Sequence, residues 1–335
     1  MANEMADVFG SPAFNMASLT TSMNRLPFTP GRIGSMGLFT PKPITTTIAL
    51  LEEQKGKLSL IPSKPRGSPA SVIPPVKRTV RSVPVPHFPH DSHVKPDDII
   101  GVRQFGSADQ MQTVVGVVND RLTRMKQDHQ VTREWLYMGA LKGKVLDSDG
   151  VGVLADLFTI FSVTEQSFDF KLGTDATKIR QICLKVKRFI EEKLGGVPYD
   201  HIHAFCGYDF FQRLIDHKDV LAAYDRFQDG VMRRNDPRSG FPFAGIIFEE
   251  YPGSVGDQAF VDPKQARFFP VGAPGLFEVA YAPADQMGAV GTPGLEFYAS
   301  QALLDHDKGV SIHTQSNPLP YCTVPEVCCK GESTN

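Results

Sequence analysis

Proline is the residue that most limits how this chain can fold. Nine prolines fall between residues 62 and 96. A proline has no backbone N–H and a fixed φ, so it interrupts helices and is excluded from the middle of a sheet. Residues 41–90 are therefore expected to form an extended, edge-like hairpin. Three β-like runs support this, at residues 45–51, 57–61 and 76–85, the first two joined by a polar turn that contains Gly56.

The same segment is basic. Between residues 41 and 95, nine Lys and Arg stand against three Asp and Glu. So long a stretch without regular structure is unusual inside a compact monomer, whereas a projecting hairpin that lies on another subunit accounts for it. We expect its positive side chains to meet acidic surface on that neighbour: Lys57, Lys64, Arg66, Lys77, Arg78 and Arg81.

Residues 1–40 show little periodicity and are dominated by Ser, Thr, Met, Gly and Pro. This composition is typical either of a disordered tail or of an extended arm that becomes ordered only against a neighbouring molecule. Both interpretations stay open on the residues alone.

The strongest helical pattern covers residues 107–141. Ser107 is a suitable N-cap and Asp109 places a negative charge in the first turn. Apolar residues then recur at steps of three and four, which predicts one amphipathic helix about 50 Å long. A break into two helices near residues 127–130 is the alternative. The apolar positions are Met111, Val114, Val115, Val118, Leu122, Met125, Trp135, Leu136 and Leu141.

The rest of the chain mixes helices and strands. A hairpin is predicted around the turn 147–150, and a helix from Thr174 to Leu194 that ends at Gly195. Shorter helices are expected at residues 208–217 and 220–228. Strands are expected in the runs FAGIIFEEY, QARFFPV, LFEVAYAP, LEFYAS and GVSIHTQS. The expected class is α+β.

Composition restricts the function. With 335 residues and 41% hydrophobic content, the chain can bury a substantial core in about two domains. A net charge of −2 argues against a nucleic-acid reader. The N-terminus does not resemble a signal peptide and no run approaches the length of a membrane span. The five cysteines lack zinc-type spacing and are expected to be reduced thiols in the cytoplasm.

A search for catalytic and metal-binding patterns yields weak candidates. Asp147 begins a sequence like a calcium loop, but Phe158 stands where the bidentate Glu belongs. His201 and His203, with a nearby Asp, could serve a metal-assisted hydrolase, although no third ligand stands at a persuasive spacing. The group His87, His90 and His93 could titrate together or bind a metal, and is more simply an exposed loop. No P-loop or nucleophile elbow is present, so no cofactor is expected and function is expected to reside in surfaces.

Five segments resemble, in order and spacing, the phage lambda-type major capsid protein family. They are EWLYMGALKGKVLDSDG at 134–150, FPFAGIIFEEYPG at 241–253, QARFFPVGAPGLFEVAYAPAD at 265–285, AVGTPGLEFYAS at 289–300 and IHTQSNPLPYCTVPEV at 312–327. The stretches Ala282–Asp285 and Gln315–Val327 match the family's "APAD" and "QSNPLP…PEV" patterns most clearly.

The resemblance implies the HK97-like α+β capsid fold. Residues 1–40 would be its N-terminal arm, residues 41–90 its E-loop, and residues 161–300 its axial domain. The peripheral domain would combine residues 91–160 and 301–335, with the helix at about 107–141 as its spine, backed by strands from 76–85 and 310–327.

The resemblance also implies a non-enzymatic shell protein. Its copies would form the hexamers and pentamers of an icosahedral virion shell assembled in the host cytoplasm, with no membrane partner. The implied partners are a separate scaffold protein, a portal, a decoration protein and packaged double-stranded DNA held without sequence-specific contacts. An encapsulin-like cargo compartment and, far behind, the hydrolase of His201 and His203 are the alternatives.

Overall fold

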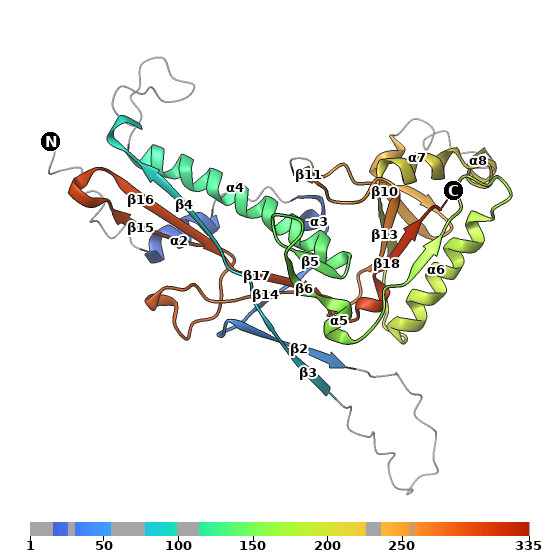
Figure 1. Ribbon diagram of the computed structural model, residues 1–335, viewed down its shortest axis with the longest axis horizontal. Helices are drawn as coiled ribbons and strands as arrows, with labels where there is room; N and C mark the ends of the chain where they lie inside the picture. Colours follow the sequence, from blue (N-terminus) through green and yellow to red (C-terminus); the bar gives the residue numbers. More distant parts are fainter. Residues whose placement is uncertain are drawn as a thin grey trace, which may run out of the picture. The chain divides into compact units, whose positions relative to one another are not determined.

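The computed structural model describes residues 16–25, 31–54, 78–98, 114–225, 236–255 and 258–334. They fall into two compact units, each built from several stretches of chain (Figure 1). The first unit takes its described residues from 1–49, 83–134 and 279–319, and the second from 50–82, 135–278 and 320–335.

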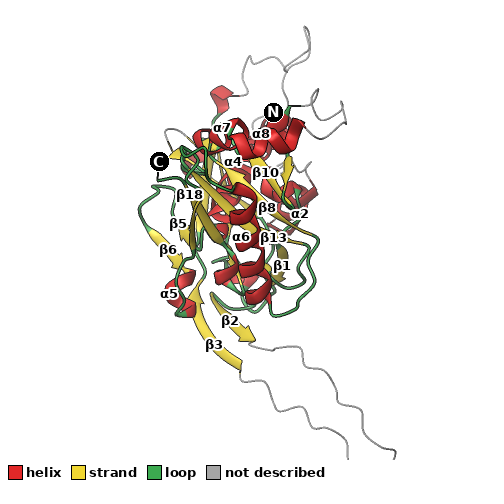
Figure 2. Cartoon of the chain, turned by 90° about the vertical axis from the view of Figure 1, so that its right-hand side faces the viewer, coloured by secondary structure: helices red, strands yellow, loops and turns green. Residues whose placement is uncertain are grey.

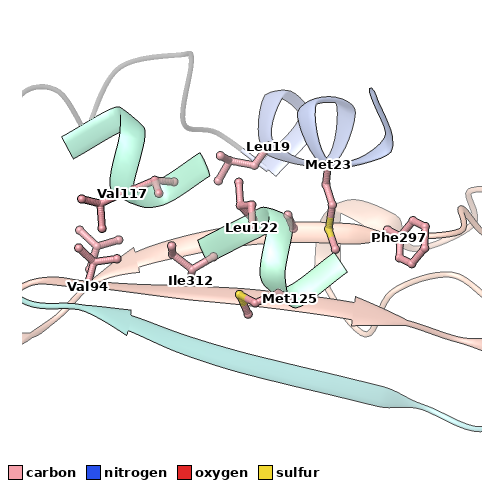
Figure 3. Close-up of a cluster of buried hydrophobic side chains, with 11 residues drawn as sticks. Leu19, Met23, Val94, Val117, Leu122, Met125, Phe297 and Ile312 are labelled. Carbon is pink, nitrogen blue, oxygen red and sulfur yellow. The ribbon is translucent and has the colours of Figure 1, made fainter. Parts of the chain in front are cut away.

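The first unit is built around a three-stranded antiparallel sheet. Its strand order is β15 (Tyr298–Leu303), β16 (Val310–Ser316) and β4 (Phe88–Val94). The helices α4 (Val114–Leu141) and α2 (Met16–Arg25) pack with it, and their apolar side chains meet those of the strands (Figure 3). The buried cluster comprises Leu19, Met23, Val94, Val117, Val118, Leu122, Met125, Phe297, Ala299, Val310 and Ile312.

The long helix matches its prediction closely. Helix α4 is continuous from Val114 to Leu141, so the interpretation as a single helix is confirmed and the break near 127–130 is not observed. Residues 107–113, including the expected N-cap Ser107, lie outside the described residues. The buried Val118, Leu122 and Met125 follow the apolar stripe read from the sequence.

The N-terminal segment differs from both expectations. Helix α2 inserts Leu19 and Met23 into the core of the first unit, and the Thr20 hydroxyl donates to the carbonyl of Ala299 at 3.2 Å. The short helix α3 (Arg32–Ser35) and strand β1 (Thr40–Pro43) follow. The described part of residues 1–40 is therefore neither a tail nor an arm that needs a neighbour to become ordered, because its apolar residues find partners within their own chain.

The strand beside β16 also differs from the prediction. The expected run 76–85 contains β3 (Arg78–Pro84), which pairs with β2 (Ile48–Gln54) and not with the sheet of the first unit. Besides β15, the strand paired with β16 is β4, a segment that carries Pro89. Proline is tolerated there because, in the described chain, β4 is the outer strand of its sheet.

The second unit contains a six-stranded mixed sheet in the order β7–β18–β13–β8–β10–β9. Strand β8 is parallel to β10 and antiparallel to β13. Figure 2 shows α6, α7 and α8 together with these strands. The strands are β7 (Ser167–Asp169), β8 (His201–Cys206), β9 (Phe241–Phe243), β10 (Ile246–Glu250), β13 (Gln265–Val271) and β18 (Cys329–Glu332).

Aromatic residues form much of the interior of the second unit. The ring of Phe170 stacks on that of Phe268 with centroids 5.5 Å apart and meets the ring of Phe210 at 5.3 Å. Because Phe268 belongs to β13 and Phe210 to α7, these contacts hold helix and sheet together. The helices are α6 (Ile179–Leu194), α7 (Tyr208–Asp216) and α8 (Lys218–Asp225).

Helix α6 begins later than predicted. Its first residue is Ile179, and Lys178 rather than Thr174 is the N-cap, without a side-chain capping bond. Residues 171–177 form hydrogen-bonded turns instead, with Thr174 N donating to Lys171 O at 3.0 Å. The predicted end is confirmed, because Gly195 adopts the left-handed conformation with φ 64° that glycine accepts easily.

The C-terminal residues divide differently from the expected domain ranges. Strand β18 pairs with β13 and β7, so residues 320–334 belong with the second unit and not with the sheet of β15, β16 and β4. The hairpin of β5 (Lys144–Leu146) and β6 (Val153–Asp156) is where the Asp-Ser-Asp-Gly turn predicted it.

The remaining elements are short. Strands β14 (Phe277–Tyr281) and β17 (Pro318–Cys322) form a three-stranded sheet with β1, and β11 (Ser254–Val255) pairs with β12 (Gln258–Ala259). The predicted strand LEFYAS begins only at Tyr298. The other helical turns are α5 (Leu157–Phe161), η2 (Pro96–Asp98), η3 (Pro237–Ser239), η4 (Met287–Ala289), η5 (Asp305–Asp307) and η6 (Pro325–Val327).

Candidate functional site

The two-stranded hairpin of β2 and β3 exposes apolar side chains. Along β2, Ala49 and Leu51 are buried while Ile48 and Leu50, on the opposite face, are 47% and 58% exposed. On β3, Val83 is buried and Val80 is 52% exposed. We call Ile48, Leu50 and Val80 the hairpin surface. Apolar residues on a two-stranded hairpin, which is marginally stable by itself, point to a partner that covers them.

The hairpin also has backbone groups that are available for pairing. Among the described residues, β2 pairs only with β3. Unpaired N–H and C=O groups at the edge of a sheet are a template onto which another chain can add a strand. The hairpin thus combines an apolar face with open edges.

The six basic residues predicted to contact a neighbour are not brought together by the described structure. Lys57, Lys64, Arg66 and Lys77 lie outside the described residues, and only the backbone of Arg78 is described, within β3. The Arg81 guanidinium donates to the Ser162 hydroxyl at 3.4 Å and lies 5.9 Å from the centre of the Phe161 ring. Arg81 therefore contacts its own chain.

The two motifs that carried the family resemblance lie against each other in the first unit. The Gln315 side-chain amide donates to Asp285 Oδ1 at 3.0 Å, and Asn317 Nδ2 donates to the carbonyl of Pro283 at 2.9 Å. The Ala282 N–H donates to the carbonyl of Asn317 at 3.1 Å. The two segments are therefore joined by side-chain and backbone hydrogen bonds. These bonds explain why Asp285, Gln315 and Asn317 stand at these positions.

The candidate metal ligands His201 and His203 belong to the sheet of the second unit. His203 is buried and its Nε2 lies 3.1 Å from Glu249 Oε2 on the neighbouring strand. His201 lies on the same face, and burial together with His203 lowers the pKa of its imidazole. Across the described residues, no group of three or more His, Cys, Asp and Glu could hold a metal ion.

The histidines of the proline-rich segment do not converge either. His87 Nδ1 lies 2.9 Å from Asn317 Oδ1, whereas His90 Nε2 lies 3.3 Å from Asp128 Oδ2. His93 is exposed on β4. Each therefore has a different environment, and the three do not form a common site.

The five cysteines are free and buried. Burial raises the pKa of the Cys183 thiol to about 12 and raises that of Cys206 well above its usual value. A thiol in this state is a poor nucleophile because the thiolate is the reactive form. The expectation of reduced thiols without a disulfide is confirmed. In the described chain, no helix is both long and apolar enough to cross a membrane.

The family model described as phage major capsid protein E matches residues 15–333. The chain belongs to the phage major capsid protein E family. The resemblance seen in the five sequence segments is thereby confirmed over nearly the whole length.

Two curated major capsid proteins are similar to this family member along their full length. That of Salmonella phage Felix O1 is 30% identical, over 94% of this chain and 95% of its own. That of Pseudomonas phage KPP10 is 28% identical, over 96% and 97%. Because both relatives are phage capsid proteins, the cargo-compartment and hydrolase alternatives are not favoured.

Solved capsid structures share the fold of this capsid protein. A putative capsid protein from a prophage of E. coli CFT073 aligns with a TM-score of 0.55 at 14% identity, over 96% of this chain and 99% of that chain. The capsid of Ralstonia phage GP4 aligns with a TM-score of 0.50 at 10% identity, over 89% and 88%. The expected HK97-like α+β capsid fold is confirmed.

Membership defines the function in outline. The chain is a phage major capsid protein, a structural component of the virion that associates with copies of itself in a shell lattice. The hairpin surface, which the sequence analysis did not single out, is the feature of the described residues best suited to such contacts. The sequence carried no signal for it, because Ile48, Ala49, Leu50 and Leu51 are all apolar and the run does not show which face is covered.

Proposed function

We propose that this chain forms the hexamers and pentamers of an icosahedral shell that encloses packaged double-stranded DNA, with the β2–β3 hairpin as a principal contact between subunits. The hairpin surface supports this proposal most directly. Half-exposed Ile, Leu and Val side chains each gain on the order of 1 kcal/mol when a neighbour covers them. Such small gains add up when every subunit of a closed shell makes the same contact.

The hairpin then corresponds to the E-loop of the fold, with the described strands at its base. The first unit corresponds to the peripheral domain, with α4 as its spine, and the second unit to the axial domain. This assignment moves the C-terminal strand β18 into the axial domain, since it pairs there with β13 and β7.

The test is an assembly assay on the double variant Leu50→Glu/Val80→Glu. Because both side chains are exposed, the variant should fold like the parent by circular dichroism and urea denaturation. It should remain as monomers or small oligomers by sedimentation and electron microscopy where the parent forms particles. A matched control, Leu50→Met/Val80→Ile, keeps the surface apolar and should assemble. Particles of normal yield and size from the glutamate variant would contradict the role of the hairpin.

The basic residues of the hairpin add an electrostatic contribution to the same proposal. Lys57, Lys64, Arg66, Lys77 and Arg78 are proposed to meet acidic surface on the adjacent subunit, outside the shell and away from the DNA. Lys64→Glu/Arg66→Glu should weaken assembly at low salt, and the difference from the parent should shrink at about 1 M salt, where charges are screened beyond about 3 Å. The control is Lys185→Glu on the exposed face of α6. Equal assembly of parent and variant at low salt would refute this contribution.

The partners follow from the same proposal. A separate scaffold protein, a portal and a decoration protein are proposed, with assembly in the host cytoplasm and no catalytic activity of the subunit. Co-expression with the neighbouring genes of the phage tests the scaffold, because the subunit with its scaffold should form closed particles of uniform size and the subunit alone should form irregular ones.

A further inference from the structure

His129 occupies a buried position in the first unit between α4 and the sheet. Its imidazole Nε2 lies 3.0 Å from the Thr314 hydroxyl on β16, and its ring meets those of His90 and Phe297 with centroids 6.0 and 6.1 Å apart. The side chain thus contacts two adjacent strands of the sheet, β4 through His90 and β16 through Thr314. Figure 3 shows these two strands beside α4.

The Thr314 hydroxyl links His129 to strand β4 as well as to β16. A hydroxyl has one proton to donate, and that of Thr314 goes to the carbonyl of His90 at 3.2 Å. With the hydroxyl donating to that carbonyl, the Thr314 oxygen can accept from His129, and the neutral tautomer that fits this arrangement carries its proton on Nε2. A second proton, taken from solvent, has to add at Nδ1 and creates a buried cation.

The surroundings do not favour that cation. Each nearby carboxylate is already paired with another group: Asp128 with His90 at 3.3 Å, Asp91 with His313 at 2.5 Å and Glu296 with Arg133 at 2.9 Å. The positive or titratable groups around His129 are His90 on β4, His313 on β16, and Lys126 and Arg133 on α4 itself. Burial first, and then His90 and His313, lower the pKa of His129 to about 4.

We propose that His129 is an acid-sensitive switch in this fold: its protonation separates α4 from strands β4 and β16 and opens the first unit while the second unit stays folded. At neutral pH the uncharged imidazole bridges the two layers. On acidification, the second proton on His129 places a cation in a buried site beside the rings of His90 and Phe297, with little water to solvate it. The switch is independent of the assembly role proposed above.

Hydrogen exchange on the full-length chain tests the switch. Peptides from 88–94 and 310–316 should exchange at least about tenfold faster at pH 4.5 than at pH 7, after correction for intrinsic rates, because protonation populates the open state. His129→Gln can still donate to Thr314 but cannot gain a charge, so this acceleration should disappear. His93→Gln, an exposed histidine on the same strand, should retain it. Peptides from β8 and β13 of the second unit report whether opening is local.

A measurement on the parent protein keeps the proposal testable if the variant folds poorly. With histidines labelled at Cε1, the His129 signal should titrate with a pKa of about 4, and its titration should coincide with the opening of β4 and β16. A switch that persists in folded His129→Gln, or a His129 signal that titrates near pH 6.5, would overturn the proposal.

Discussion

Glu134 on α4 binds the backbone at Ile33 in the N-terminal segment. Its Oε1 accepts from the Ile33 N–H at 2.6 Å, and its Oε2 accepts from the N–H of Gly34 at 3.0 Å. Glu134 is 7% exposed, so its carboxylate satisfies the free N–H groups at the start of α3 at a buried position. Gly31 makes room for it, since a Cβ there would lie 2.3 Å from the Glu134 carboxyl carbon.

Replacing Glu134 tests whether this carboxylate holds the N-terminal segment in place. Glu134→Gln presents an amide N–H where an acceptor is required, and it should lower the free energy of unfolding by about 2 kcal/mol, the range for hydrogen bonds to a charged group. Urea denaturation measures the loss, and limited proteolysis should show earlier cleavage within residues 31–43. Gln127→Ala, at an exposed position of the same helix, should change stability by less than about 0.5 kcal/mol. An unchanged cleavage pattern would contradict the role of Glu134.

The sequence correctly predicted those elements whose bounds are set by residues close to them in the chain. Strand β13 has the bounds of the run QARFFPV, and α6 ends where Gly195 provides a left-handed residue. The end of α4 at Leu141 was also predicted. In each case the determining residues lie within a few positions of the element they shape.

Features that depend on distant residues were missed. Prolines around Phe88 concealed β4, which is a strand because β16 lies beside it. The position of α2 depends on contacts of Leu19 and Met23 with a cluster of residues from Val94 to Ile312, and no pattern within residues 1–40 shows them. The role of Glu134 could not be predicted, since a carboxylate that binds backbone looks in sequence like any solvated charge.

The sequence predicted only part of the candidate site, again because burial depends on residues that are distant in the sequence. Proline and charge predicted the hairpin, and its Lys and Arg side chains were the expected contacts. The exposed apolar residues Ile48, Leu50 and Val80 became evident only when the burial of their neighbours was known. Sequence alternation shows two faces of a strand and leaves open which face is covered.

The buried cysteines predict slow reaction with thiol reagents. Burial raises the pKa of Cys183 to about 12, and the Cys322 side chain together with burial raises that of Cys328. Native protein at pH 8 should therefore react at none of its five cysteines within minutes, and all five should react in 6 M guanidinium chloride. Absorbance of the released thiolate from Ellman's reagent measures both. Rapid modification of one thiol in the native state would show that its region opens readily.

The bonds between Gln315 and Asp285 predict a moderate loss on substitution. Gln315 is fully buried, donates to Asp285 Oδ1 at 3.0 Å and accepts from the Asp285 N–H at 3.5 Å. Gln315→Met retains the side-chain volume and removes both hydrogen bonds. The free energy of unfolding should therefore fall by about 1–2 kcal/mol. Urea denaturation followed by circular dichroism measures it, with Gln127→Met as the control at an exposed site. A change equal to that of the control would mean that the two motifs are held together by other contacts.

The depressed pKa of His129 predicts how stability depends on pH. The imidazole charges near pH 6.5 in the unfolded chain and at about 4 in the folded protein. Between these values the unfolded state binds more protons, so the stabilisation is fully present above pH 6.5 and is lost as pH falls to about 4. The difference between the two pKa values corresponds to about 3 kcal/mol of unfolding free energy. Urea denaturation of parent and His129→Gln at pH 7, 5.5 and 4.5 isolates it, because other groups contribute equally to both proteins. From pH 7 to 4.5, the free energy of unfolding of the parent should fall by about this amount more than that of the variant. Parallel losses in the two proteins would mean that His129 gains its proton as easily in the folded state as in the unfolded one.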